Sequence, residues 1–99
     1  MQVLLIGAVA LAASCQTTPP VQEMSDARQA IAVAREAGAE ERAAIHLRAA
    51  ETYLESAEQQ LSARKYAEAR YDAKQAKMKA LDALRASESL PPAPREKSL

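Results

Sequence analysis

The stretch that decides the fold is 43–83, AAIHLRAAETYLESAEQQLSARKYAEARYDAKQAKMKALDA. Small and apolar residues recur in it alternately four and three residues apart, which places them on one face of a helix that meets another helix. They form two stripes, Ala43, Leu47, Ala50, Leu54, Ala57 and Leu61, then Tyr66, Ala69, Ala73, Ala76, Ala80 and Ala83. The sequence therefore predicts an antiparallel helical hairpin.

The turn of this hairpin is predicted near 63–66, although neither Gly nor Pro marks it. Leu61, Tyr66 and Ala69 have the spacing of the turn in tetratricopeptide-type hairpins, where an aromatic residue opens the second helix. We expect one helix from Glu40 or Glu41 to Ala63 and another from Tyr66 to Ser87. Without a break here, the two would form one long rod.

An earlier helix is predicted to start at Ser25 and Asp26, which are favourable residues at a helix N-terminus, and to end at Gly38. Its apolar stripe is Met24, Ala27, Ile31 and Ala34. The last helix has a second apolar stripe, Tyr71, Met78, Leu81 and Leu84, which we expect to pack on this earlier helix or, alternatively, to form a partner surface. The predicted fold is all-α, an up-down-up three-helix bundle over residues 23–88.

The amino terminus indicates export and lipidation. Residues 1–13 form an uncharged apolar run of the length of a signal-peptide core, too short to span a bilayer comfortably. The following Leu11-Ala12-Ala13-Ser14-Cys15 resembles the lipobox of bacterial lipoproteins, which implies that Cys15 is lipidated and becomes the first residue of the mature chain. The alternative is a Cys buried in an apolar helix. Gln16 resembles the residue found after the Cys in lipoproteins of the outer membrane.

These features predict four segments. Residues 1–14 are a lipoprotein signal peptide, and 15–22 are the lipidated Cys15 followed by an extended tether with two prolines. Residues 23–88 are the helical domain. Residues 89–99 contain three prolines, and we expect them to form a disordered tail.

Charge is balanced overall and segregated along the chain. The 13 basic and 13 acidic residues cancel, which gives no electrostatic argument for nucleic acid. Acidic residues dominate 23–58 and basic residues dominate 64–85. We expect the acidic and the basic segment to attract one another or to expose solvated faces. Alternatively, the basic segment faces an anionic surface. Arg70, Lys74 and Lys77 share a helix face and are the candidate contacts for an anionic polymer.

The sequence has no pattern typical of a catalytic site. It contains one His, one Cys and no Gly-rich phosphate loop, and no metal-ligand spacing is found. We expect His46 to be a boundary residue without a ligand. We therefore predict no enzymatic activity, no metal and no cofactor apart from the lipid on Cys15.

Several segments together resemble the DUF4398 family, small lipoproteins of Gram-negative bacteria with an Ala-rich helical domain and no assigned activity. The resemblance rests on the segments 25–31, 34–39, 47–61 and 66–70, and it covers about residues 22–88. It implies a helical domain behind a lipid anchor. It implies no functional residue beyond Cys15.

The sequence thus predicts a lipid-anchored outer-membrane protein that presents a helical bundle to the periplasm. Its expected role is structural or adaptor-like, through helix–helix contacts with another envelope protein or a second copy. The alternative is non-covalent binding of peptidoglycan or lipopolysaccharide through Arg70, Lys74 and Lys77.

Overall fold

Four helices make up the part of the chain that the computed structural model describes, residues 18–89. They are α1 (Val21–Glu36), α2 (Ala39–Arg42), α3 (Ala44–Ser62) and α4 (Tyr66–Ser89). Described residues contain no strand, and the all-α prediction is confirmed. No helix in this range is long and apolar enough to span a bilayer.

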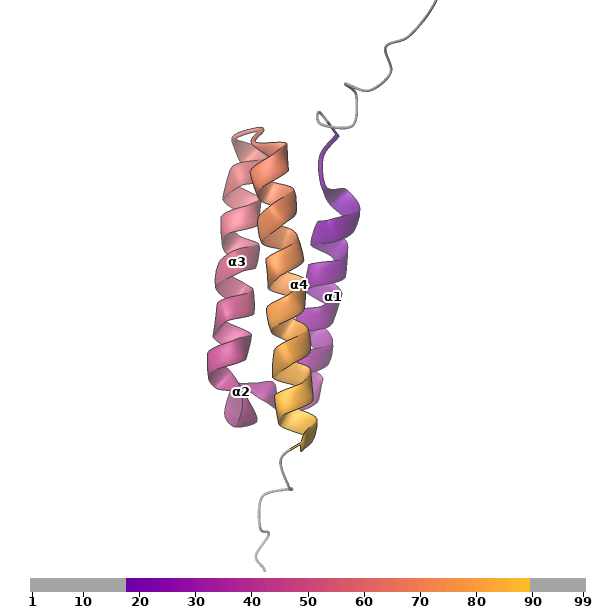
Figure 1. The fold of residues 1–99 in the computed structure, drawn as a ribbon, viewed down its shortest axis with the longest axis vertical. Helices are drawn as coiled ribbons and strands as arrows, with labels where there is room; N and C mark the ends of the chain where they lie inside the picture. Colours follow the sequence, from indigo (N-terminus) through magenta and orange to yellow (C-terminus); the bar gives the residue numbers. More distant parts are fainter. Residues whose placement is uncertain (1–17, 90–99) are drawn as a thin grey trace, which may run out of the picture.

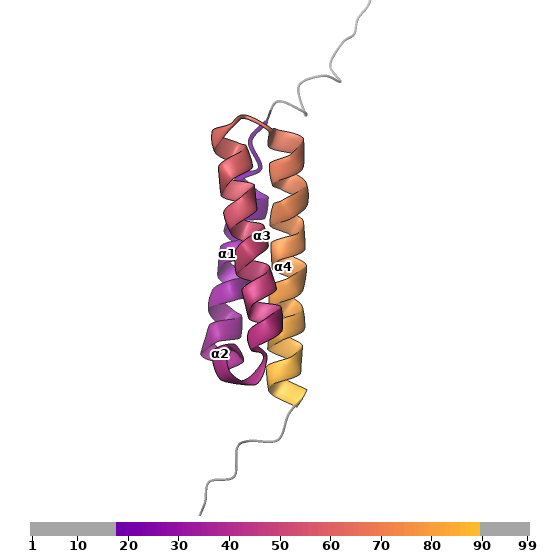
Figure 2. The ribbon, with the colours of Figure 1, turned by 90° about the vertical axis from the view of Figure 1, so that its left-hand side faces the viewer.

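The three long helices lie side by side and alternate in direction (Figures 1 and 2). The start of α1 and the α3–α4 turn lie at one end of the bundle, and α2 lies at the other end, beside the last turns of α4. Helix α4 packs along both α1 and α3, which contact one another less. The predicted three-helix bundle is therefore present, with α4 as its shared element.

A seam of small side chains on α4 holds the bundle together. Five alanines of α4 are completely buried, namely Ala69, Ala73, Ala76, Ala80 and Ala83. Completely buried alanines also lie on the other two helices, Ala27 and Ala34 on α1 and Ala50 and Ala57 on α3. Since a methyl group projects little from a helix, neighbouring backbones can approach closely and gain dispersion energy along their length.

Larger apolar side chains fill the two halves of this seam. Ile31 and Leu47 belong to a cluster toward α2, and Met24 packs with Ala57 and Ala73 toward the α3–α4 turn. Leu54 packs against both clusters and so links them. The core is thin, because most of its members are alanines that contribute only a methyl group.

Helix α1 begins earlier than predicted, at Val21 rather than near Ser25, so the predicted tether over 15–22 is too long. The Pro20 carbonyl accepts a hydrogen bond from the Met24 N–H at 3.0 Å, and Pro20 itself is buried. A proline that precedes the first helical turn costs no hydrogen bond, because the N–H it lacks has no partner in the helix. Asp26 accepts a hydrogen bond from Gln22 within the helix instead of capping its start.

The connection from α1 to α3 is more complex than predicted. Gly38 ends α1 as expected, with a left-handed φ of 87° that glycine adopts without steric cost. The predicted single helix from Glu40 or Glu41 to Ala63 is wrong, because Ala43 leaves helical geometry (φ −147°, ψ 47°) and separates the one-turn α2 from α3. Arg42 then donates a hydrogen bond to the Ser87 carbonyl of α4, at 3.1 Å, and ties α2 to the bundle.

The α3–α4 turn lies where the sequence predicts it, and the long-rod alternative is wrong. Helix α3 ends at Ser62 and Tyr66 opens α4. Arg64 supplies the left-handed residue of the turn, with φ of 63°, in place of glycine. Its N–H donates to the Leu61 carbonyl, which satisfies one of the last carbonyls of α3.

The second apolar stripe of α4 is only half covered. Leu81 and Leu84 pack against the core, as predicted. Tyr71 and Met78 are 62% and 57% exposed, so the prediction that they pack on the earlier helix is wrong. Seven residues complete nearly two helical turns, so Tyr71 and Met78 lie on the same side of α4. Tyr71 is two residues from both Ala69 and Ala73, about half a turn around the helix, so this side is opposite the alanine seam.

The predictions for residues 1–17, including the signal peptide and Cys15, lie outside the described residues, as does the predicted tail beyond Ser89. Helix α4 ends at Ser89, two residues later than predicted.

Replacing Ala73 by Leu should destabilise the bundle by about 1–3 kcal/mol, because the extra atoms force α4 away from its neighbours. Ala67→Leu is the matched control, since Ala67 is exposed on the same helix and should change stability by less than about 0.5 kcal/mol. Urea unfolding followed by circular dichroism measures both variants. Equal midpoints for the two would contradict the close-packed seam.

Candidate functional site

An open groove between α1 and α3 is the candidate site, because ion pairs between the two helices border it. Ile31 of α1 and Leu54 of α3 line its apolar part, and charged side chains line the rest. The remaining lining residues are Arg28, Arg35, Glu51, Glu55 and Glu58. The groove has a volume of about 330 Å³ and is open to solvent. We call these seven residues the α1–α3 groove.

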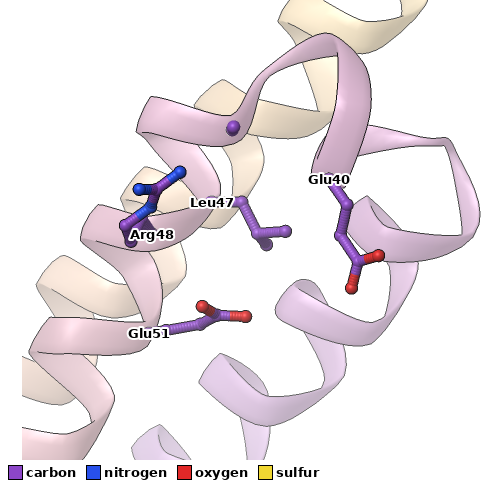
Figure 3. A pocket seen from close by; sticks show the side chains of 5 residues that line it. Glu40, Leu47, Arg48 and Glu51 are labelled. Atoms are coloured by element: carbon purple, nitrogen blue, oxygen red, sulfur yellow. The ribbon is translucent and has the colours of Figure 1, made fainter.

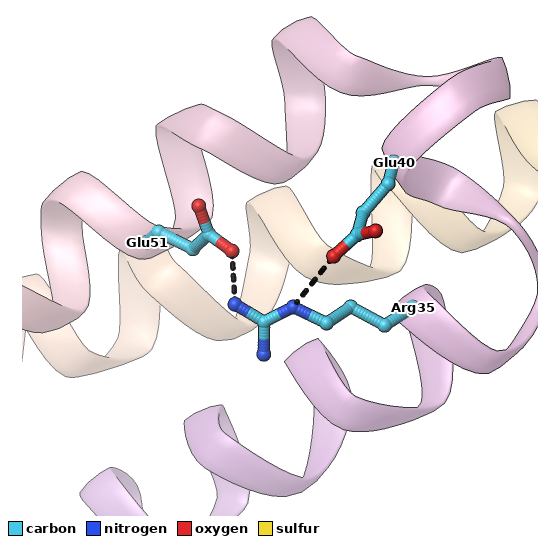
Figure 4. A network of polar contacts seen from close by, with 3 residues as sticks. All are labelled: Arg35, Glu40 and Glu51. Atoms are coloured by element: carbon cyan, nitrogen blue, oxygen red, sulfur yellow. Dashed lines mark hydrogen bonds and ion pairs between the residues drawn. The ribbon is translucent and has the colours of Figure 1, made fainter.

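Ion pairs bridge the groove from one helix to the other. Arg28 donates to Glu58 at 3.1 Å. Arg35 pairs with Glu51 of α3 and, through Nε at 3.5 Å, with Glu40 of α2 (Figure 4). These side chains remain 39–67% exposed, and such pairs contribute only about 0–1 kcal/mol each. A ligand with its own charges can therefore exchange partners with them at low cost.

A smaller hollow of about 140 Å³ adjoins the groove at Glu51. The carboxylates of Glu40 and Glu51 lie on either side of Leu47, and Arg48 projects from α3 nearby (Figure 3). The two hollows together are bordered mainly by charged side chains, and Leu54 is the partly exposed apolar residue between them, since Ile31 and Leu47 are buried.

Sequence reasoning missed this groove. The sequence gives the charges of α1 and α3, and the spacing of Arg48 and Glu51 favours ion pairs within one helix. The observed pairs instead cross between helices, which depends on how far α1 and α3 separate around α4. The local pattern contains no signal for that separation.

The predicted anionic-polymer cluster is not a concentrated patch of positive charge. Arg70 is 26% exposed and pairs with Glu23 at 3.3 Å, and it also donates to the Thr18 carbonyl at 2.9 Å. Lys74 and Lys77 are exposed, but they line a hollow together with Glu23 and Asp26. Acidic groups of α1 thus offset the three cations, which weakens the prediction that they bind an anionic polymer.

His46 is exposed and lines an open hollow of about 430 Å³ with Ile45 and Ala86. Its surroundings are mainly apolar, and the placement is consistent with a boundary residue. Among residues 18–89, no group of three or more His, Cys, Asp or Glu side chains is placed to hold a metal ion.

Comparison with known proteins adds no relative. No family model, no curated protein and no solved structure matches the chain. The resemblance to the DUF4398 family therefore stays a prediction.

Proposed function

We propose that this protein is anchored to the outer membrane by lipid on Cys15 and presents its helical bundle to the periplasm as a structural or adaptor module. The lipobox-like segment 11–15 supports the anchor, and the resemblance to the DUF4398 family supports the same compartment. No reaction is assigned to the protein.

One observation carries the adaptor role, namely the open groove between two helices that are joined at its rim by weak ion pairs. An incoming amphipathic helix would place an apolar side chain over the exposed part of Leu54 and its charged residues against the rim. Burial of that apolar surface is favourable at about 25 cal/mol per Å². The partner would be another envelope protein or a second copy of this chain.

The start of the bundle is compatible with this anchor. Thr18, three residues after Cys15, is held against α4 by Arg70, and Pro20 is buried. A lipid on Cys15 would therefore hold the bundle by the end where α1 begins and leave the α1–α3 groove accessible along its side.

The intact mass of protein extracted from membranes of a Gram-negative host tests the anchor. We expect the mass of residues 15–99 plus a diacylglyceryl and a further acyl group, because the thiol of Cys15 is the group modified in a lipobox. Cys15→Ser should retain its leader and carry no lipid. An unmodified chain that starts at Met1 would refute the anchor and the localisation.

Site-specific photo-crosslinking tests the adaptor role. A photoreactive amino acid in place of Glu55, which is exposed in the groove, should yield a defined product that mass spectrometry identifies as a second copy or an envelope protein. The same amino acid in place of Met78, exposed on the outward face of α4, is the matched control and should yield none. Products of equal yield from both positions, or none from position 55, would argue against the groove as the contact surface.

A further inference from the structure

The end of the bundle from which the chain leads back to Cys15 is basic. The α3–α4 turn lies at this end, beside the start of α1 (Figures 1 and 2). Its two central residues, Arg64 and Lys65, are both exposed, and Arg64 holds the left-handed backbone conformation of the turn. Val21, the first residue of α1, is 68% exposed at the same end.

The acidic groups near this end mostly have partners. Glu23 pairs with Arg70 and Glu58 pairs with Arg28, so each is offset by a cation. Glu68, in the first turn of α4, is the remaining acidic residue close in sequence to the turn. The exposed cations of Arg64 and Lys65 therefore outnumber the one exposed carboxylate, that of Glu68, near the turn.

We propose that Arg64 and Lys65 contact anionic phospholipid headgroups and hold the bundle upright on the membrane. The inference rests on the proposed anchor at Cys15. Two residues lie between Cys15 and Thr18, so three Cα–Cα steps limit the distance between them to about 11 Å. The short connection keeps this end of the bundle near the membrane, and Lys and Arg within about 8 Å of an anionic surface are attracted to it at physiological ionic strength.

The competing orientation has the bundle lying on the outward side of α4. That side exposes Tyr71, Met78 and Lys74. Of the cations on this side, Arg85 pairs with Asp82 at 2.9 Å, and Lys74 and Lys77 line one hollow with Asp26. The tip of the turn has a similar excess of positive charge, but it lies at the end from which the chain leads back to Cys15, and this position favours the upright orientation.

Three single-tryptophan variants distinguish these orientations, since the chain contains no Trp. Ala63→Trp reports on the α3–α4 turn, Met78→Trp on the side of α4 and Ile45→Trp on the far end. All three positions are exposed. Eighteen helical residues place position 45 about 27 Å from position 63 along α3.

The lipidated variants are reconstituted into vesicles of phosphatidylethanolamine and phosphatidylglycerol that contain a phospholipid with a quencher at the headgroup. We expect the emission of A63W to be quenched several-fold more than that of M78W or I45W. Replacing the phosphatidylglycerol by phosphatidylcholine, or raising the salt to about 1 M, where the Debye length is about 3 Å, should remove most of this difference.

Charge removal identifies the residues responsible. In the A63W background, Arg64→Asn with Lys65→Gln should reduce quenching to the level on phosphatidylcholine, and Asn accommodates the positive φ at position 64. Lys74→Gln with Lys77→Gln removes the same charge from α4 and should leave the quenching unchanged. Circular dichroism confirms that each variant keeps its helical content.

Two results would overturn the inference. One is quenching of M78W as strong as that of A63W, which would show the side-lying orientation. The other is A63W quenching that stays as strong on phosphatidylcholine vesicles, and after Arg64→Asn with Lys65→Gln, as it is for A63W alone on vesicles with phosphatidylglycerol. The intact mass shows separately whether Cys15 carries a lipid. If it carries none, the full chain is coupled through Cys15, its single cysteine, to a maleimide-bearing phospholipid. The same quenching measurements then test whether Arg64 and Lys65 contact the headgroups.

Discussion

The close approach of α4 to both of its neighbours is the constraint on which the rest of this structure depends. Fully buried alanines run from Ala69 to Ala83 on α4, and they meet small residues on α1 and α3. With few large side chains in the core, stability depends on the length of these seams and on the high helix propensity of Ala, Glu, Lys and Arg. A residue larger than Ala on the seam would push α4 away from the helix that it contacts there.

Much of this arrangement could be predicted from sequence. The alternating spacing from Ala43 to Ala83 predicted the α3–α4 hairpin, and Gly38 correctly marked the end of α1. The break at Ala43 could not be predicted, because it lies within an alanine run that favours helix and is imposed by the turn between α1 and α3. The spacing of Tyr71 and Met78 favoured packing on α1 or, alternatively, a partner surface, yet the alanine seam, rotated by about half a turn, is the face that α4 buries.

The candidate site was less predictable than the fold. Arg70, Lys74 and Lys77 do share one side of α4, but Glu23 and Asp26 of α1 are brought beside them by packing. The α1–α3 groove arises for the related reason that α1 and α3 both pack on α4 and separate from one another. Both results depend on contacts between residues distant in sequence. In the account proposed above, one end of the bundle faces the membrane and its side receives a partner helix.

Native-state hydrogen exchange, followed by NMR at increasing denaturant concentration, tests most directly whether the alanine seam unites the three long helices. If it does, buried amides around Ala27 of α1, Ala50 of α3 and Ala76 of α4 exchange only through global unfolding, with one common free energy. Because α1 is short for an isolated helix, it should be protected only when packed on α4. Exchange of α1 at a much lower free energy than α3 and α4 would contradict the account, since it would show a hairpin with a detachable first helix.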